Sequence, residues 1–208
     1  WRVLDKKDRE ILLLSEYGLD AQPFDTSGKS RVDWKDSTIR KWLNDDFYNS
    51  AFSEKEKENI VESKSEGFEE YNTSMNLTGG GKPYAYLERE IEDKVFLLSN
   101  TELCAYFSED PYPGCYSDPY AHKELLCYPT AYAKQQLETR YQTETCGWWL
   151  CNHVYEDDSV ELVSAYGQGS GTSRENIKAN TKSIAVRPAM WVTWQSDMEM
   201  VEANQQVE

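Results

Sequence analysis

Two short stretches of the sequence decide the fold, and they read Trp148-Trp149-Leu150 and Val186-Arg187-Pro188-Ala189-Met190-Trp191. Both are apolar runs that carry large aromatic rings, which is typical of strands that pack into a core. They lie within the longer segments 147–151 and 184–194, with a further apolar segment at 160–166 between them. We therefore expect these three segments to form strands, and they contain no recognisable catalytic constellation.

The amino-terminal segment predicts a hairpin. Apolar runs at Arg2–Leu4 and Ile11–Leu14 flank a charged stretch, Asp5–Glu10, that is typical of a turn. A continuous apolar run at Lys94–Leu98 predicts another strand, buried on both faces. Strands near the two ends of the chain are expected to pair with each other.

Helices are predicted where apolar residues recur at helical spacing or where capping patterns occur. The first follows an N-cap at Asp36 or Ser37 and is expected to be buried through Trp42. Capping boxes of the Ser-x-x-Glu type predict two more helices, one after Ser53 and one after Ser99, and 129–137 predicts a further short one. The segments 72–83, 109–119 and 167–173 are expected to be loops.

Composition limits the classes of function. The 208 residues suit one domain, 1–208, and aromatic residues make up 13% of them, so aromatic packing is expected to supply much of the core. A formal net charge of −15 excludes ordinary phosphate-mediated binding of nucleic acid. No run of roughly 18 apolar residues predicts a membrane span. Because the chain begins at Trp1, we expect that an upstream leader or anchor has been removed.

Four blocks of sequence, taken in order, carry a resemblance. They are Trp34-x-x-Ser37-x-x-Arg40-x-Trp42-Leu43-Asn44, Asp93-Lys94-Val95-Phe96-Leu97-Leu98-Ser99, Trp148-Trp149-Leu150 and Val186-Arg187-Pro188-Ala189. In this arrangement the chain resembles an uncharacterised bacterial domain family of unknown function, common in secreted and surface proteins of Gram-positive gut bacteria. The resemblance covers nearly the whole chain and implies an extracellular or cell-surface location.

That family is in turn similar to the C-type-lectin-like superfold, which includes formylglycine-generating and sulfatase-modifying-factor enzymes. The resemblance implies an α+β domain with a small twisted, mainly antiparallel sheet, short flanking helices and long loops. One position departs from the family pattern, because Cys151 stands where an arginine usually follows Trp-Trp-Leu. A salt bridge that such an arginine would make is therefore absent from this chain.

The five cysteines leave two interpretations open. Cys104, Cys115, Cys127, Cys146 and Cys151 cannot all pair within one chain, so at least one is free or pairs elsewhere. One or two disulfides in an oxidising compartment and a set of small buried thiols fit the sequence equally well.

Enzymatic and metal sites have weak support. Cys146 and Cys151 have the cysteine spacing of formylglycine-generating enzymes, but the register of that motif would place the second cysteine at Glu156. Zinc would need a fourth ligand beside Cys146, Cys151 and His153. Calcium could draw on acidic pairs, but no calcium-loop motif is present. We expect no catalytic residue, no cofactor and no bound metal. The acidic pairs are Asp45-Asp46, Glu109-Asp110 and Glu156-Asp157-Asp158.

Two arginines beside aromatic residues are expected to be structural. Arg187 should bond to backbone carbonyls or to a carboxylate, with Asp93 or Glu102 as candidates, because buried guanidinium groups are normally paired. The same reasoning applies to Arg40. Together the residues expected to be structural are Trp34, Arg40, Trp42, Asn44, Trp149 and Arg187.

Exposed aromatic rings are the expected functional feature, since tyrosine and tryptophan stack on sugar rings or peptide side chains. Trp148 and Trp149 should point to opposite faces of a strand, with Trp149 in the core and Trp148 at the surface. The sequence thus predicts a non-enzymatic recognition module for a glycan or a surface protein. The alternatives are a formylglycine-generating type of enzyme that uses Cys151, or a structural spacer. The predicted ligand-binding residues are Tyr84, Tyr86, Tyr112, Tyr116, Tyr120 and Trp148.

Overall fold

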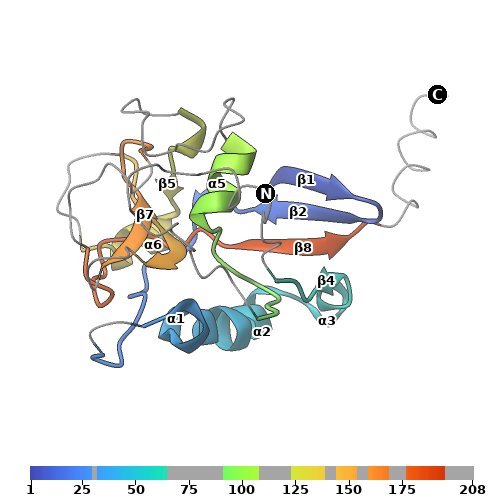
Figure 1. Ribbon diagram of the computed structural model, residues 1–208, viewed down its shortest axis with the longest axis horizontal. Coiled ribbons are helices and arrows are strands. Elements are labelled where there is room, and N and C mark those ends of the chain that lie inside the picture. The colour runs from blue at the N-terminus through green and yellow to red at the C-terminus, as the bar shows by residue number, and fades with distance from the viewer. Residues whose placement is uncertain are drawn as a thin grey trace, which may run out of the picture.

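A four-stranded antiparallel sheet joins the two ends of the chain (Figure 1). The computed structural model describes residues 1–29, 32–64, 91–107, 123–138, 144–153, 159–168 and 177–194. The strand order is β1-β2-β8-β4, with β1 at Arg2–Lys7, β2 at Glu10–Leu14, β8 at Ala189–Thr193 and β4 at Ile60–Val61. The expected amino-terminal hairpin is therefore present, with its turn at Asp8-Arg9, and β8 pairs directly with β2.

Two smaller sheets lie at the other end of the molecule. β6 (Trp148–His153) pairs antiparallel with β7 (Val160–Val163), and β3 (Tyr17–Gly18) pairs in parallel with β5 (Tyr128–Pro129). The architecture is thus mixed α+β, with small and mostly antiparallel sheets. Short helical segments surround these sheets. Three of them come from the middle of the chain: α5 (Asn100–Phe107), η3 (Lys123–Leu125) and α6 (Ala131–Gln136).

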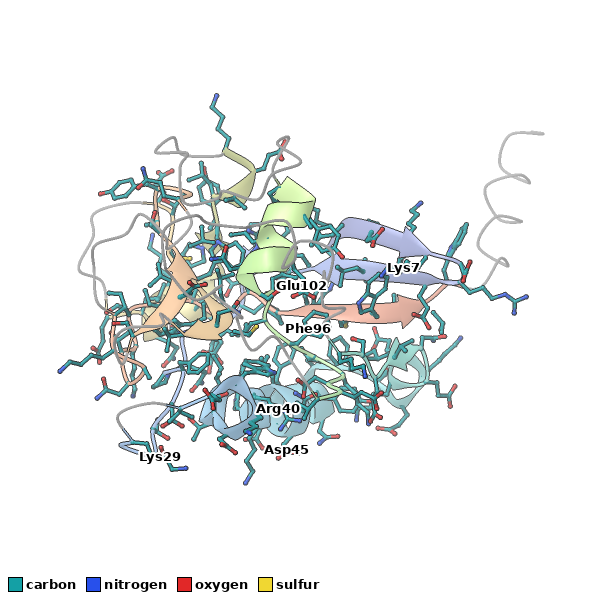
Figure 2. The ribbon with its side chains drawn as sticks, viewed as in Figure 1. Lys7, Lys29, Arg40, Asp45, Phe96 and Glu102 are labelled. Atoms are coloured by element: carbon teal, nitrogen blue, oxygen red, sulfur yellow. The ribbon has the colours of Figure 1, made fainter. Side chains whose placement is uncertain are left out.

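A layer of helical turns covers one side of the molecule (Figures 1 and 2). It consists of a 3-10 turn η1 (Trp34–Asp36), α1 (Thr38–Trp42), a π-helical turn η2 (Leu43–Phe47) and α2 (Tyr48–Ala51), with α3 (Glu54–Lys57) beyond. The Ser37 hydroxyl accepts a hydrogen bond from the Arg40 amide, as its N-cap position predicts. The layer is buried through Ile39 and Leu43, whereas Trp42 is only partly buried.

Both predicted capping boxes are present. The Ser53 amide donates to the Glu56 carboxylate at 2.8 Å, and the Ser99 amide donates to the Glu102 carboxylate at 2.7 Å.

The prediction of a buried strand at Lys94–Leu98 is wrong in one respect. Residues 95–98 are fully buried, but the segment joins β8 only through an isolated bridge between Phe96 and Ala189. Apolar character predicted its burial and could not predict its hydrogen-bond partners.

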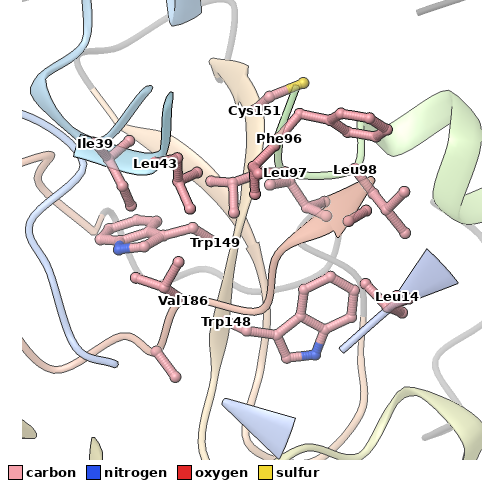
Figure 3. Packing of buried hydrophobic residues seen from close by; sticks show 14 of the residues in the cluster. Leu14, Ile39, Leu43, Phe96, Leu97, Leu98, Trp148, Trp149, Cys151 and Val186 are labelled. Atoms are coloured by element: carbon pink, nitrogen blue, oxygen red, sulfur yellow. The ribbon is translucent and has the colours of Figure 1, made fainter. Parts of the chain in front are cut away.

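The core lies where β6 passes between the helical layer and the large sheet (Figure 3). Trp149 extends toward Ile39 and Leu43, and Trp148 extends the opposite way toward Leu14. The two indoles thus leave opposite faces of β6, as alternation in a strand requires. Both faces are covered, so both rings are fully buried.

Candidate functional site

Two exposed tyrosines stand side by side on the small parallel sheet. Tyr17 on β3 and Tyr128 on β5 are register partners, and their side chains are 52% and 47% exposed. Register partners in neighbouring strands present their side chains on the same face, with the strands roughly 4.8 Å apart. Tyr132, which is also exposed, follows in the first turn of α6. We call Tyr17 and Tyr128 the tyrosine face.

Thr130 ties the tyrosine face to the rest of the fold. Its amide donates to the carbonyl of Gly18 at 2.9 Å, and its hydroxyl donates to the carbonyl of Leu19 at 3.2 Å. The same hydroxyl oxygen accepts from the Ala133 amide and so caps α6. β3 is held on its other side because the Leu19 amide donates to Val186. The positions of the exposed rings are thus set by backbone bonds to buried segments.

The opposite face of this sheet is packed without space to spare. A Cβ atom added at Gly18 would lie 2.8 Å from the Cβ of Ala185, closer than real side chains approach. The same point is 3.3 Å from the sulfur of Cys146 and 3.5 Å from that of Cys127. Gly18 is therefore required by a close approach of strands, and two thiols lie beneath it. The backbone amide of Cys146 also donates to the carbonyl of Cys127 at 2.8 Å.

Arg187 lies beside these thiols and is fully buried. Its Nε donates to the carbonyl of Ser15 at 2.8 Å, and its guanidinium lies over the ring of Trp148 at 4.9 Å from the centroid. Among the described residues, neither terminal nitrogen of the guanidinium has a hydrogen-bond partner. Cys127, Cys146 and Arg187 together form what we call the thiol–arginine cluster.

The pKa values of the two thiols in this cluster are shifted in opposite directions. The interaction with the Cys146 side chain lowers the pKa of Cys127, burial opposes this shift, and the positive charge of Arg187 adds to it. The Cys146 thiol donates to the backbone carbonyl of Cys127 at 3.5 Å. The pKa of Cys146 is raised, first because its proton is held by Cys127 and second because the site is buried. The pair therefore releases its first proton more easily than an isolated thiol and resists losing the second.

A second buried polar group lies where α5 meets β6 and β7. The side-chain amide of Asn100 donates to the Glu161 carboxylate at 2.9 Å, and the backbone N–H of Asn100 donates to the side-chain oxygen of Asn152 at 2.7 Å. Burial raises the pKa of Glu161 to about 7, although the bond from Asn100 opposes the rise. The Nδ2 of Asn152 has no hydrogen-bond partner within the described ranges.

Three of the six residues predicted to be structural meet at Asp93. The carboxylate of Asp93 accepts from Trp34 Nε1 at 2.8 Å and from Arg40 Nε at 2.7 Å, and Asn44 Nδ2 lies 3.3 Å away. Asn44 also bonds to the backbone of Lys94 and Val95 through its side-chain oxygen. We call Trp34, Arg40, Asn44 and Asp93 the aspartate cluster, and it fastens the helical layer to the buried segment after Asp93.

Two expectations about these residues need correction. Arg187 bonds to a backbone carbonyl as expected, but Asp93 pairs with Arg40 and Glu102 caps the turn at Ser99, so neither of the proposed carboxylates pairs with Arg187. Trp148 has no exposed ring face, because the residue is fully buried with the guanidinium of Arg187 over its ring. Its indole N–H donates to Leu125 at 3.0 Å, while Trp149 donates to Gln22.

The remaining predicted residues divide into two groups. Cys127, Cys146 and Cys151 are buried, and Asp45 and Asp46 are exposed. Within the described ranges, no group of three or more His, Cys, Asp or Glu side chains could hold a metal ion. The others lie outside the described residues: Tyr84, Tyr86, Tyr112, Tyr116, Tyr120, Cys115, His122, Glu109-Asp110 and Glu156-Asp157-Asp158. The side chains of Cys104 and His153 are likewise not described.

Sequence reasoning missed the tyrosine face because Tyr17 and Tyr128 are far apart in the chain. Each follows an apolar segment and precedes a residue suited to a close turn, Gly18 or Pro129, which is a weak local signal. Only the parallel pairing of β3 and β5 brings them together.

Comparison with known proteins gives one match. The model of a family described as Domain of unknown function (DUF6273) matches residues 8–194. No curated protein and no solved structure matches the chain significantly. In the part of the chain that the structure describes, every helix is too short or too polar to cross a membrane.

Proposed function

The chain belongs to the DUF6273 family, whose description gives no activity. We therefore propose a function from the geometry of the molecule itself. The protein is a non-enzymatic recognition module at an extracellular or cell-surface location, and it binds neutral glycans through the tyrosine face. The observation that carries this proposal is the pairing of Tyr17 and Tyr128, two half-exposed rings on adjacent strands.

Aromatic rings fixed on a sheet suit the binding of sugars. A pyranose ring presents an apolar face of C–H groups that stacks on tyrosine, and the phenol hydroxyl offers a hydrogen bond at the edge. The backbone bonds of Thr130 and Leu19 hold the two strands in place, so little ordering is needed on binding. The tyrosine face is thus organised before the ligand arrives.

The charge of the protein indicates which glycans fit. A formal net charge of −15 repels polyanions such as phosphorylated or uronic-acid-rich polymers and leaves neutral sugars unaffected. The resemblance to the C-type-lectin-like fold forms part of this proposal, and the mixed α+β architecture is compatible with it. A surface protein is the alternative ligand for the same tyrosine face.

The formylglycine-generating type of enzyme gains no support from the position of Cys151. Its side chain is buried, its backbone amide donates to Leu98, and its sulfur lies 3.8 Å from the side-chain oxygen of Asn152. Burial in apolar surroundings disfavours the thiolate that such an enzyme needs. The third possibility, a structural spacer, has no ligand.

A glycan array followed by calorimetry on the best neutral ligand tests the proposal. The double variant Tyr17→Ala/Tyr128→Ala should weaken binding at least about fivefold, because each stacked ring contributes roughly 0.5–1.5 kcal/mol. Tyr166→Ala is the matched control, since Tyr166 is 54% exposed but follows β7. The proposal fails if no neutral glycan binds, or if the double variant binds as tightly as the control.

A further inference from the structure

We propose that Cys127 and Cys146 form a thiol–disulfide exchange site, in which Arg187 is the cation that positions and stabilises the thiolate of Cys127. The site lies beneath Gly18, on the inner face of the sheet whose outer face carries Tyr17 and Tyr128. The proposal is independent of glycan binding. Its substrate class is a disulfide, either small or carried by another protein.

The spacing of the two cysteines permits a covalent bond. Both sulfur atoms lie within 3.5 Å of the position that a Cβ atom on Gly18 would take. The 2.8 Å bond from the Cys146 amide to the Cys127 carbonyl, together with standard backbone bond lengths, keeps the two Cα atoms no more than about 7 Å apart. This limit meets the range of Cα separations over which disulfides form. The Cys146 sulfur also lies 3.5 Å from the carbonyl oxygen of Cys127.

The environment supplies the charge that exchange chemistry needs. Thiolate is the reactive form of cysteine, and a neighbouring cation stabilises it. Arg187 is fully buried beside Cys127, and its two terminal nitrogens have no hydrogen-bond partner among the described residues. A thiolate at Cys127 would give this guanidinium a counterion. The interaction with the Cys146 side chain and the charge of Arg187 both favour ionisation at Cys127.

The reaction balances with an external disulfide as oxidant. The Cys127 thiolate attacks one sulfur of that disulfide, a mixed disulfide forms, and the other sulfur leaves as a thiolate. Cys146 then loses its proton and attacks the Cys127 sulfur, which closes the Cys127–Cys146 bond and releases the second external thiolate. The two protons and two electrons lost by the pair reduce the external disulfide to two thiols.

Access to the pair requires a local opening, because both thiols are buried. The parallel sheet above them spans two residue pairs, so it is the natural place for such an opening. Oxidation of the folded protein should therefore be slower than oxidation during refolding, while both routes end at the same pairing.

Equilibration of the reduced protein in glutathione buffers of rising oxidised fraction tests the site. After acid quenching and alkylation in denaturant, trypsin separates the cysteines into peptides 124–134 and 141–174, as the positions of lysine and arginine dictate. Mass spectrometry should find these two peptides joined through Cys127 and Cys146, and excess dithiol should separate them. The proposal is overturned if Cys127 remains alkylatable in every buffer or joins another cysteine.

Variants make the assignment specific. Cys151→Ser should leave the link intact, because Cys151 is also buried and lies in the same tryptic peptide as Cys146 but contacts Asn152. Cys146→Ser should abolish it, and tandem mass spectrometry of the wild-type link gives the same answer if that variant fails to fold. Loss of the link in Cys151→Ser would contradict the pairing.

Arg187→Met tests the role of the arginine as a positioning residue. In the native protein the rate of mixed-disulfide formation should fall several-fold near neutral pH, and its pH profile should move to higher pH. A purely structural role for Arg187 predicts an unchanged profile, and that result would remove the arginine from the site.

Discussion

Two arginine sites in this molecule differ in how the positive charge is paired. In the aspartate cluster, Arg40 meets a buried carboxylate that also accepts from Trp34, and Asn44 bonds to the adjoining backbone. In the thiol–arginine cluster, Arg187 has one bond to a carbonyl and two terminal nitrogens without hydrogen-bond partners in the described part of the chain. The first arrangement is that of a scaffold, because its charges are matched within the fold. The second leaves a charge available for chemistry.

The same contrast extends to the neighbouring polar groups. Among the described residues, the Nδ2 of Asn152 joins the guanidinium of Arg187 as an unpartnered buried group in the half of the molecule that contains β6. The hydroxyl of Ser63, next to the bridge with Asp93, is the exception in the other half. Native proteins leave few buried polar groups unsatisfied, so their concentration around β6 distinguishes that region.

Of the substitutions that test this contrast, Arg40→Met should change the free energy of unfolding most. The substitution leaves the Asp93 carboxylate buried without its cation, and the free energy of unfolding should fall by about 3 kcal/mol. Urea denaturation followed by tryptophan fluorescence measures it. A loss below about 1 kcal/mol would mean that Trp34 and Asn44 alone satisfy the carboxylate.

Glu161→Gln should change the pH dependence of stability next most strongly. The pKa of Glu161 is raised from 4.5 to about 7 in the folded protein, so this carboxyl ionises at lower pH in the unfolded chain. The protonated Glu161 therefore stabilises the fold below about pH 4.5, and this stabilisation is lost as pH rises to about 7. This loss amounts to roughly 3 kcal/mol. The difference between wild type and variant in urea melts across this range isolates it, and parallel curves would contradict the raised pKa.

Arg187→Met should alter stability by less than about 1 kcal/mol in either direction. A buried guanidinium that lacks a full set of partners is replaced by an apolar side chain of similar length at little net cost. The same replacement at Arg40 serves as the matched comparison under identical conditions. Equal losses at the two arginines would remove the distinction between the clusters.

Arg2→Met should have the smallest effect. Arg2 and Glu16 form a 2.8 Å ion pair at the surface beside Tyr17, and exposed pairs contribute roughly 0.2–1 kcal/mol. The hydrogen bond from Arg2 lowers the pKa of Glu16, so this small contribution is present above the ordinary pKa of a glutamate and disappears as pH falls through the lowered value. An NMR titration of Glu16 should show its pKa rising in the variant, and an unchanged pKa would show that the pair is absent in solution.

Local signals in the sequence predicted local structure well. Ser37, Ser53 and Ser99 cap their turns as expected, because a cap depends on residues within one turn of it. The hairpin and the buried run after Asp93 were found for the same reason. What the apolar pattern could not provide was the partner of each buried segment, so Phe96 was assigned to a strand that it does not form.

The errors at the candidate site are long-range ones. The pairing of Arg40 with Asp93 joins residues 53 positions apart, and the meeting of Tyr17 with Tyr128 depends on a two-residue parallel sheet. Trp148 was expected at the surface because alternation identifies opposite faces of a strand, but it does not reveal that both faces are covered. The contact of Cys127 with Cys146 could not be chosen from among five cysteines by spacing alone.

The π-helical turn at Leu43–Phe47 constrains the number of residues in this segment as well as their identity. Such a turn holds one residue more than an α-helical turn, and here Asn44 fills the irregularity by donating to the Arg40 carbonyl while it also reaches Val95. Deleting one residue from the turn would make the helix regular and rotate everything after it by about 100°. Tyr48, which lies under the ammonium groups of Lys57 and Lys94, would leave the core. Insertions and deletions in this family should therefore avoid the turn, even where single substitutions within it are accepted.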